Sequence, residues 1–161
     1  MPFSSFEISK NTFWKLSCKK LDQYLNDYSK WEDFDENCKR CKIDLPIKMT
    51  KHIYNLSSLK YSINLENSLV HLVDYNIDES YEVSNHNDNC KITIIIYLEK
   101  NEGIEENLKI DHKFTHQEFW SKNKDKYGCL VMWSELDETG PDHSILIKGY
   151  GNRKVLCLFL G

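Results

Sequence analysis

Apolar residues follow two different periods on either side of Leu45 and Pro46. Before this point they recur every three or four residues, at Trp14, Cys18, Leu21, Leu25 and Tyr28. This spacing predicts an amphipathic helix over residues 9–31, with a broad apolar face that packs on a core.

After Leu45 and Pro46 the period changes to that of short strands, some of which alternate apolar and polar residues as half-buried strands do. The predicted strands cover residues 59–65, 70–75, 92–98, 108–114, 129–133, 144–148 and 155–160. Residues 92–98 give the strongest strand signal because most of them are β-branched or aromatic.

Three further segments connect these runs. The polar stretch 78–89 reads as a loop, and the glycines of residues 149–152 predict the turn of a hairpin. Thr115 and Glu118 match a capping box, which predicts a short helix over residues 116–124.

The order of these elements lacks the regular strand–helix alternation of parallel sheets. We therefore expect an α+β fold, in which the N-terminal amphipathic helix packs on a mainly antiparallel β-sheet with one further short helix. With 161 residues, the chain has the length of one ordinary domain, so residues 1–161 are expected to form a single globular domain.

Two observations bear on location. No apolar run approaches the roughly 20 residues of a membrane helix, and lysines interrupt the first 30 residues, which excludes a secretory h-region. We therefore expect a cytoplasmic protein with no membrane role. Its six cysteines are expected to be free thiols in a reducing compartment.

Charge is concentrated in the middle of the chain. Residues 61–111 contain three lysines and eleven acidic residues, a net charge of −8, against −4 for the whole chain. Such a segment disfavours nucleic acid and favours a basic protein partner. The acidic residues expected at a partner surface are Glu66, Asp74, Asp78, Glu79, Glu82 and Asp88. Alternatively, these residues only keep one side of a sheet solvated.

One cysteine pair has the spacing of metal ligands. Cys38 and Cys41 are separated by two residues, a spacing that lets two thiolates hold one Zn²⁺ ion. A closed site needs two further ligands, and His112 and His116 are the weak candidates for them. Lone pairs with this spacing are common by chance, so we expect no metal and no other cofactor.

Histidines also permit an acid–base enzyme. His71, His112, His116 and His143 lie in or beside predicted strands, with Lys113 and Lys148 available to stabilise an anion. The glycines at positions 149 and 151 do not form a phosphate loop, because no helix follows them.

No catalytic motif in the chain names a reaction, so the sequence favours a non-enzymatic binding module. The most concrete hypothesis is an inhibitor of the immunity-protein type, which neutralises a basic partner, for example a nuclease, through its acidic surface. Alternatives are a small histidine-based hydrolase or zinc-binding domain, and a viral protein that binds a host factor. The absence of alanine, with abundant Asn, Lys, Ile and Tyr, indicates an AT-rich gene, which suits both the immunity-type inhibitor and the viral alternative.

Overall fold

The computed structural model describes residues 3–7, 21, 25, 31–114, 128–134 and 139–161. Its elements are β1 (Phe3–Glu7), β2 (Glu32–Asp35), β3 (Cys38–Lys42), α2 (Ile47–Leu56), η1 (Leu65–Asn67), β4 (Leu69–His86), β5 (Ile92–Lys100), β6 (Glu105–Ile110), β7 (Lys113–Phe114), β8 (Gly128–Trp133) and β9 (His143–Leu160).

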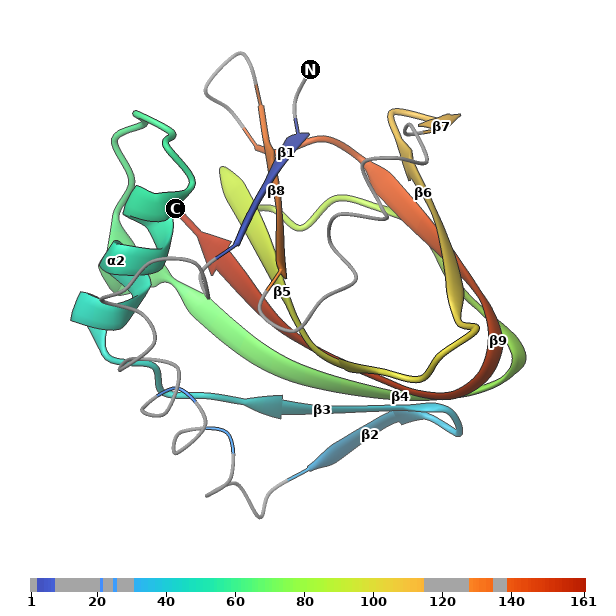
Figure 1. Cartoon of the computed structure of the whole chain (residues 1–161). Helices are drawn as coiled ribbons and strands as arrows, with labels where there is room; N and C mark the ends of the chain where they lie inside the picture. The colour runs from blue at the N-terminus through green and yellow to red at the C-terminus, as the bar shows by residue number, and fades with distance from the viewer. Residues whose placement is uncertain (1–2, 8–20, 22–24, 26–30, 115–127, 135–138) are drawn as a thin grey trace.

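Two long strands organise the molecule. β4 and β9 have 18 residues each and pair antiparallel from Leu69 opposite Phe159 to His86 opposite His143. Both strands curve together in Figure 1, so that their two halves belong to facing sheets. The larger sheet has the order β1-β8-β5-β9-β4-β3-β2, and the other halves of β4 and β9 continue with β6 and β7. Two facing antiparallel sheets that share bent strands form a jelly-roll arrangement.

Glycines permit the bend in β9. Gly149 and Gly151 have φ values of +129° and +118°, a region that residues with a Cβ rarely adopt. Gly149 pairs with Glu79 of β4, and Glu79 also has a positive φ, of 71°. The hairpin predicted around residues 149–152 is therefore wrong. These residues carry one strand from the smaller sheet into the larger one.

The larger sheet is buried on both faces. Its inner face meets the smaller sheet in an inner cluster that includes Ile95, Tyr97 and Val155 from one side and Leu108 and Ile147 from the other. Its outer face carries an outer cluster, whose residues include Leu72, Ile92, Ile94, Ile96, Leu98, Cys129, Val131, Leu156, Leu158 and Leu160. Burial on both faces explains why the apolar run 92–98 is nearly continuous.

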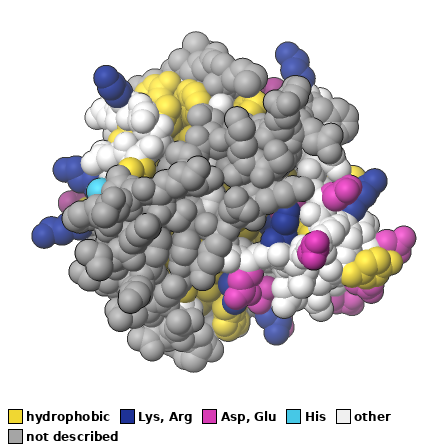
Figure 2. Space-filling view, viewed as in Figure 1, with side chains coloured by type: hydrophobic (Ala, Val, Ile, Leu, Met, Phe, Trp, Pro, Cys, Tyr) yellow, Lys and Arg dark blue, Asp and Glu magenta, His cyan; other side chains and the backbone are white. Residues whose placement is uncertain are grey.

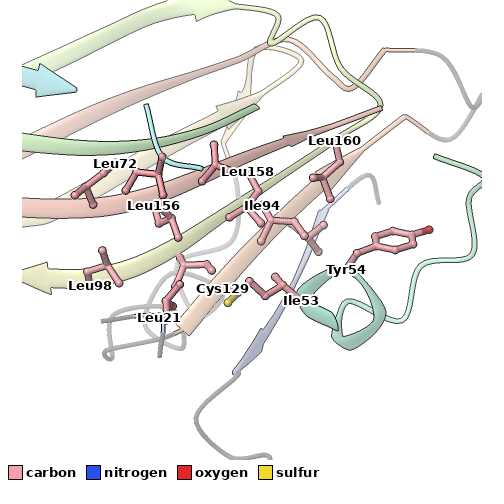
Figure 3. Close-up of a cluster of buried hydrophobic side chains, with 14 of the residues drawn as sticks. Leu21, Ile53, Tyr54, Leu72, Ile94, Leu98, Cys129, Leu156, Leu158 and Leu160 are labelled. Carbon is pink, nitrogen blue, oxygen red and sulfur yellow. The ribbon is translucent and has the colours of Figure 1, made fainter. Parts of the chain in front are cut away.

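Helix α2 covers part of the outer cluster. Ile53 of α2 points toward the strand residues in Figure 3, and Leu21 lies on the same side of the sheet. Tyr54 of α2 is buried in the same cluster. The helix predicted over residues 9–31 lies outside the described residues apart from Leu21, Leu25 and Trp31. The short helix predicted over residues 116–124 lies entirely outside them.

The expected α+β class is wrong, since the described residues form mostly antiparallel β-sheet. One physical reason is the segment 78–89, whose polar composition suggested a loop. In the structure its residues up to His86 belong to β4, with Tyr81 and Val83 packed against the inner cluster and Ser80, Glu82 and Ser84 exposed. Among the described residues, no helix is long and apolar enough to cross a membrane.

Candidate metal centre

Two histidines and one aspartate meet at the open end of the two sheets. His86 is the last residue of β4, His143 is the first residue of β9, and the two are paired across the strands. Asp88 follows two residues after His86. Its Oδ1 atom lies 3.2 Å from His86 Nε2, and its Oδ2 atom lies 3.3 Å from His143 Nε2. The two imidazole rings are 4.3 Å apart between centroids.

The segment that carries Asp88 is fixed by Asn87. The Asn87 amide donates to the Gly140 carbonyl at 2.8 Å and to Asp142 at 3.0 Å. Its own oxygen accepts from the Asn89 backbone N–H at 2.8 Å. These bonds tie residues 87–89 to residues 140–142, so the two halves of the cluster keep one geometry.

Backbone carbonyls orient both imidazole rings. His86 Nδ1 lies 2.8 Å from the Ser84 carbonyl oxygen, and His143 Nδ1 lies 3.0 Å from the Pro141 carbonyl oxygen. A carbonyl only accepts, so Nδ1 carries the proton and donates in each ring. Each Nε2 atom then faces Asp88 and donates to this carboxylate when it carries a proton. A metal that displaces the proton would take the Nε2 lone pair instead, as is usual for histidine ligands held by an outer partner.

Asp88 is ionised. Burial opposes the charged form, but hydrogen bonds with His143, His86 and Thr93 outweigh it and hold the pKa of this carboxyl well below its usual value. The Thr93 hydroxyl, on β5, donates to Asp88 Oδ2 at 2.7 Å. The site therefore offers one anionic oxygen ligand together with two imidazole nitrogens.

The three residues fit a metal ion. Their ligand atoms all lie within 4.8 Å of one another. Bonds of roughly 2.0–2.2 Å from a metal to N and O ligands place neighbouring ligand atoms about 3 Å apart, close to the two N···O distances above. Three ligands on one side leave the remaining coordination positions open, the arrangement of a 2-His-1-carboxylate site.

A cavity of about 480 Å³ extends from this cluster between the sheets. His86, Asp88 and His143 line it, as do apolar residues of both sheets, among them Ile95 and Val155. The cavity thiols are protonated, because burial raises the pKa of Cys157 to about 12 and that of Cys38 to about 11. They are therefore poor candidates for metal ligands or nucleophiles.

Arg153 also lines the cavity. It lies on β9 just after the bend, three residues beyond Tyr150, which pairs with Asp78 of β4. Its side chain is almost completely buried, and its Nε atom donates to Glu106 of β6. The rings of Tyr75 and Tyr97 flank the guanidinium at 4.9 Å and 5.5 Å. Its Nη2 atom is buried without a hydrogen-bond partner among the described residues. An unpaired buried N–H of a guanidinium points to an anionic ligand in the cavity.

The predicted zinc ligands do not meet among the described residues. Cys38 and Cys41 are three residues apart on β3, so their side chains point to opposite faces of the sheet. Cys38 lines the cavity, whereas Cys41 belongs to the outer cluster. His112 is exposed in the turn between β6 and β7, and His116 lies outside the described residues.

The residues predicted to form an acidic surface lie along β4 and directly before and after it. Glu66 lies on η1, before β4, and Asp78 and Glu79 lie at the bend in the middle of that strand. Asp74 lies near the Lys154 and Lys39 side chains, and Glu82 is exposed on the second half of β4. On the face shown in Figure 2, acidic side chains are interleaved with Lys and Arg side chains. Asp88, the sixth residue, belongs to the metal cluster.

The sequence predicts His143 as a candidate but not His86, because residues 85–89 have the composition of a loop. It places Asp88 on a charged surface. The signal that was present is the spacing His-x-Asp, which places both side chains on one side of an extended segment. His143 and, ten residues later, Arg153 complete the set.

No protein-family model and no curated protein sequence matches the chain. Solved structures resemble its fold. A prolyl 4-hydroxylase from Phytophthora capsici has a TM-score of 0.60 at 11% identity, over 99% of this chain and 58% of that one. IDO from Bacillus thuringiensis has a TM-score of 0.60 at 10% identity, over 99% and 89% of the two chains. A C-terminally truncated protein from Neurospora crassa, in apo form, has a TM-score of 0.54 at 10% identity, over 98% and 82%.

These similarities correct the functional hypothesis. At such low identity they show the fold alone, and that fold is one that carries enzymes such as a prolyl 4-hydroxylase. Together with the cluster of His86, Asp88 and His143, they overturn the immunity-type inhibitor. The alternative of a metal-binding or histidine-based enzyme agrees better with the structure. The expected basic partner stays a prediction.

Proposed function

We propose that this chain is a non-haem iron(II) oxygenase that consumes a 2-oxo dicarboxylic acid as co-substrate. The observation that carries the proposal is the convergence of His86 Nε2, Asp88 and His143 Nε2 at the mouth of a cavity, with ligand atoms within 4.8 Å. Two histidines and one carboxylate with open positions are the ligand set of non-haem iron(II) oxygenases. Bound iron(II) supplies the one-electron chemistry that activates O2.

The cavity indicates what the co-substrate looks like. A 2-oxo acid presents a carboxylate oxygen and a keto oxygen side by side, which suits adjacent open positions at the metal cluster. A second carboxylate at the far end of the same molecule would accept from the unpaired Nη2 atom of Arg153. The apolar residues of the cavity wall, including Ile95, Ile145 and Val155, suit the carbon chain between the two carboxylates.

The overall reaction balances with O2 as the oxidant. One oxygen atom enters the carboxylate that forms when the 2-oxo acid loses CO2, and the other enters a C–H bond of the primary substrate as a hydroxyl group. Two of the four electrons that reduce O2 come from the 2-oxo acid and two from that C–H bond. The likeness in fold to a prolyl 4-hydroxylase supports a hydroxylation of this type. The free, mostly buried cysteines support a place in a reducing compartment such as the cytoplasm.

The test is metal and 2-oxoglutarate binding under anaerobic conditions. We expect one iron(II) per chain, and 2-oxoglutarate binding that requires both the metal and Arg153. Asp88→Ala and His143→Ala should weaken iron binding at least a hundredfold, whereas His112→Ala, on the exposed β6–β7 turn, should leave it unchanged.

Two results would overturn the proposal. One is equal iron binding by the Asp88, His143 and His112 variants. The other is stoichiometric zinc without any metal-dependent binding of 2-oxoglutarate, which would favour a hydrolase that uses the same three residues.

A further inference from the structure

Glu106 pairs with Arg153 at the end of the cavity where both side chains are buried, which is called the closed end below. The side chains of Arg153 and Glu106 are each only 2% exposed. One oxygen of Glu106 accepts from Arg153 Nε, and the other accepts from the Tyr97 hydroxyl at 2.9 Å. Glu106 is therefore held from two sides, and it holds one edge of the guanidinium in turn.

The two charges of this pair cancel before any ligand enters. Arg153 contributes one positive charge and Glu106 contributes one negative charge, and both side chains are buried. Burial raises the pKa of the Tyr75 and Tyr97 hydroxyls, so both rings stay neutral. A carboxylate that reaches Arg153 Nη2 thus gains a hydrogen bond, but it also meets the field of a second carboxylate behind the guanidinium.

We propose that Glu106 sets the affinity of the cavity for carboxylates. It fixes the guanidinium so that the unpaired Nη2 atom is left for the ligand, and its charge keeps the binding weak. Because the carboxylate in question is that of the co-substrate, this role of Glu106 rests on the proposed function. Glu106 is a positioning residue, since Arg153 stands between it and the cavity ligand.

The isosteric variant separates the two roles of Glu106. In Glu106→Gln, the amide oxygen still accepts from Arg153 Nε, and the amide NH2 can donate to the Tyr97 hydroxyl, which both donates and accepts. The negative charge is lost, and the hydrogen bond with Tyr97 changes direction, since the Tyr97 hydroxyl donates to Glu106 in the wild type. We therefore expect Glu106→Gln to bind carboxylates at least about tenfold more tightly, because removal of a nearby like charge favours the bound anion. A purely structural role for Glu106 predicts weaker binding instead.

The experiment measures glutarate binding to the metal-free protein by calorimetry or NMR titration. Glutarate carries two carboxylates and no keto group, so this arm does not depend on metal chelation. The matched control is Glu105→Gln, which removes the same charge from the neighbouring exposed residue of β6. The double variant with Glu106→Gln and Arg153→Met leaves no buried unpaired charge and should lose the gain completely.

A second arm repeats the series with 2-oxoglutarate on the iron(II) protein without O2. The inference is overturned if Glu106→Gln binds glutarate no more tightly than the wild type and Glu105→Gln do. It is also overturned if the gain in affinity persists in the double variant that lacks Arg153. If the glutarate series behaves as expected but 2-oxoglutarate binding does not depend on iron, the proposed function fails while the role of Glu106 stands.

Discussion

The two ends of the cavity are both polar, but they are built in opposite ways. At the mouth, His86 is 39% exposed, and the three ligand atoms face one another with space for an ion. At the closed end, Arg153 and Glu106 are buried and already paired. At the mouth, the metal-binding atoms of His86, Asp88 and His143 remain available to a ligand. At the closed end, most polar atoms of Arg153 and Glu106 already bond to other side chains. A ligand that spans the cavity is therefore anchored mainly at the mouth and selected at the closed end.

The largest expected effect is on stability at the closed end. Arg153→Met leaves the Glu106 carboxylate buried without its counter-charge, which should lower the free energy of unfolding by about 3–5 kcal/mol. At the half-exposed mouth, His86→Ala should cost roughly 1 kcal/mol or less. Urea unfolding of both variants measures the contrast directly.

The control for this prediction is a second change at the same place. Adding Glu106→Leu to Arg153→Met removes the orphaned carboxylate and should restore most of the lost stability. If Arg153→Met costs no more than His86→Ala, water reaches the closed end and the two ends do not differ in how they are held.

The next effect concerns the bend that places the two ends in one cavity. A Cβ at Gly149 would lie 3.0 Å from the Gly103 carbonyl oxygen and 3.1 Å from Ile104 Cα, both backbone atoms, and φ is +129°. We expect Gly149→Ala to destabilise the fold by about 1–3 kcal/mol. In Gly140→Ala the new Cβ meets its neighbours at 3.5 Å or more, so this variant is the matched control. Equal midpoints of urea unfolding for the two variants would contradict a strained bend at Gly149.

The strands that sequence reasoning predicted best are those with two buried faces. The run 92–98 lies within β5, and residues 129–133 lie within β8. A short, unbroken apolar run indicates a strand that is buried on both faces. The second half of β4 was missed because its outer face is polar and exposed. The bend at residues 149–152 was misread because glycines permit a hairpin turn and a bend equally well. Here the choice depends on contacts with residues 101–104, such as the hydrogen bond between Asn152 N–H and the Asn101 side chain.

The site was harder to predict than the strands for a related reason. His86 and His143 are 57 positions apart in the sequence and meet only because β4 and β9 pair along their whole length. The alternation of apolar and polar residues within one strand does not show which residue of another strand lies opposite a given position. The local part of the site, His86 and Asp88, could have been found from its spacing, while its partner across the strands could only be listed among four histidines.

The smallest expected effect tests how firmly the mouth is held. Thr93→Val keeps the shape of the side chain but removes the hydroxyl that donates to Asp88 Oδ2 at 2.7 Å. Partners of metal ligands typically contribute 10–100-fold to metal affinity, and we expect a loss near tenfold because Asp88 keeps both histidines beside it. Thr50→Val is the matched control, since Thr50 is equally buried but lies on α2, where its hydroxyl bonds the Pro46 carbonyl. Anaerobic iron(II) titration gives the affinity, and urea unfolding shows whether stability changed as well. A loss confined to metal affinity means that Thr93 orients Asp88. Equal iron affinity in both threonine variants would mean that the histidines alone hold the carboxylate in place.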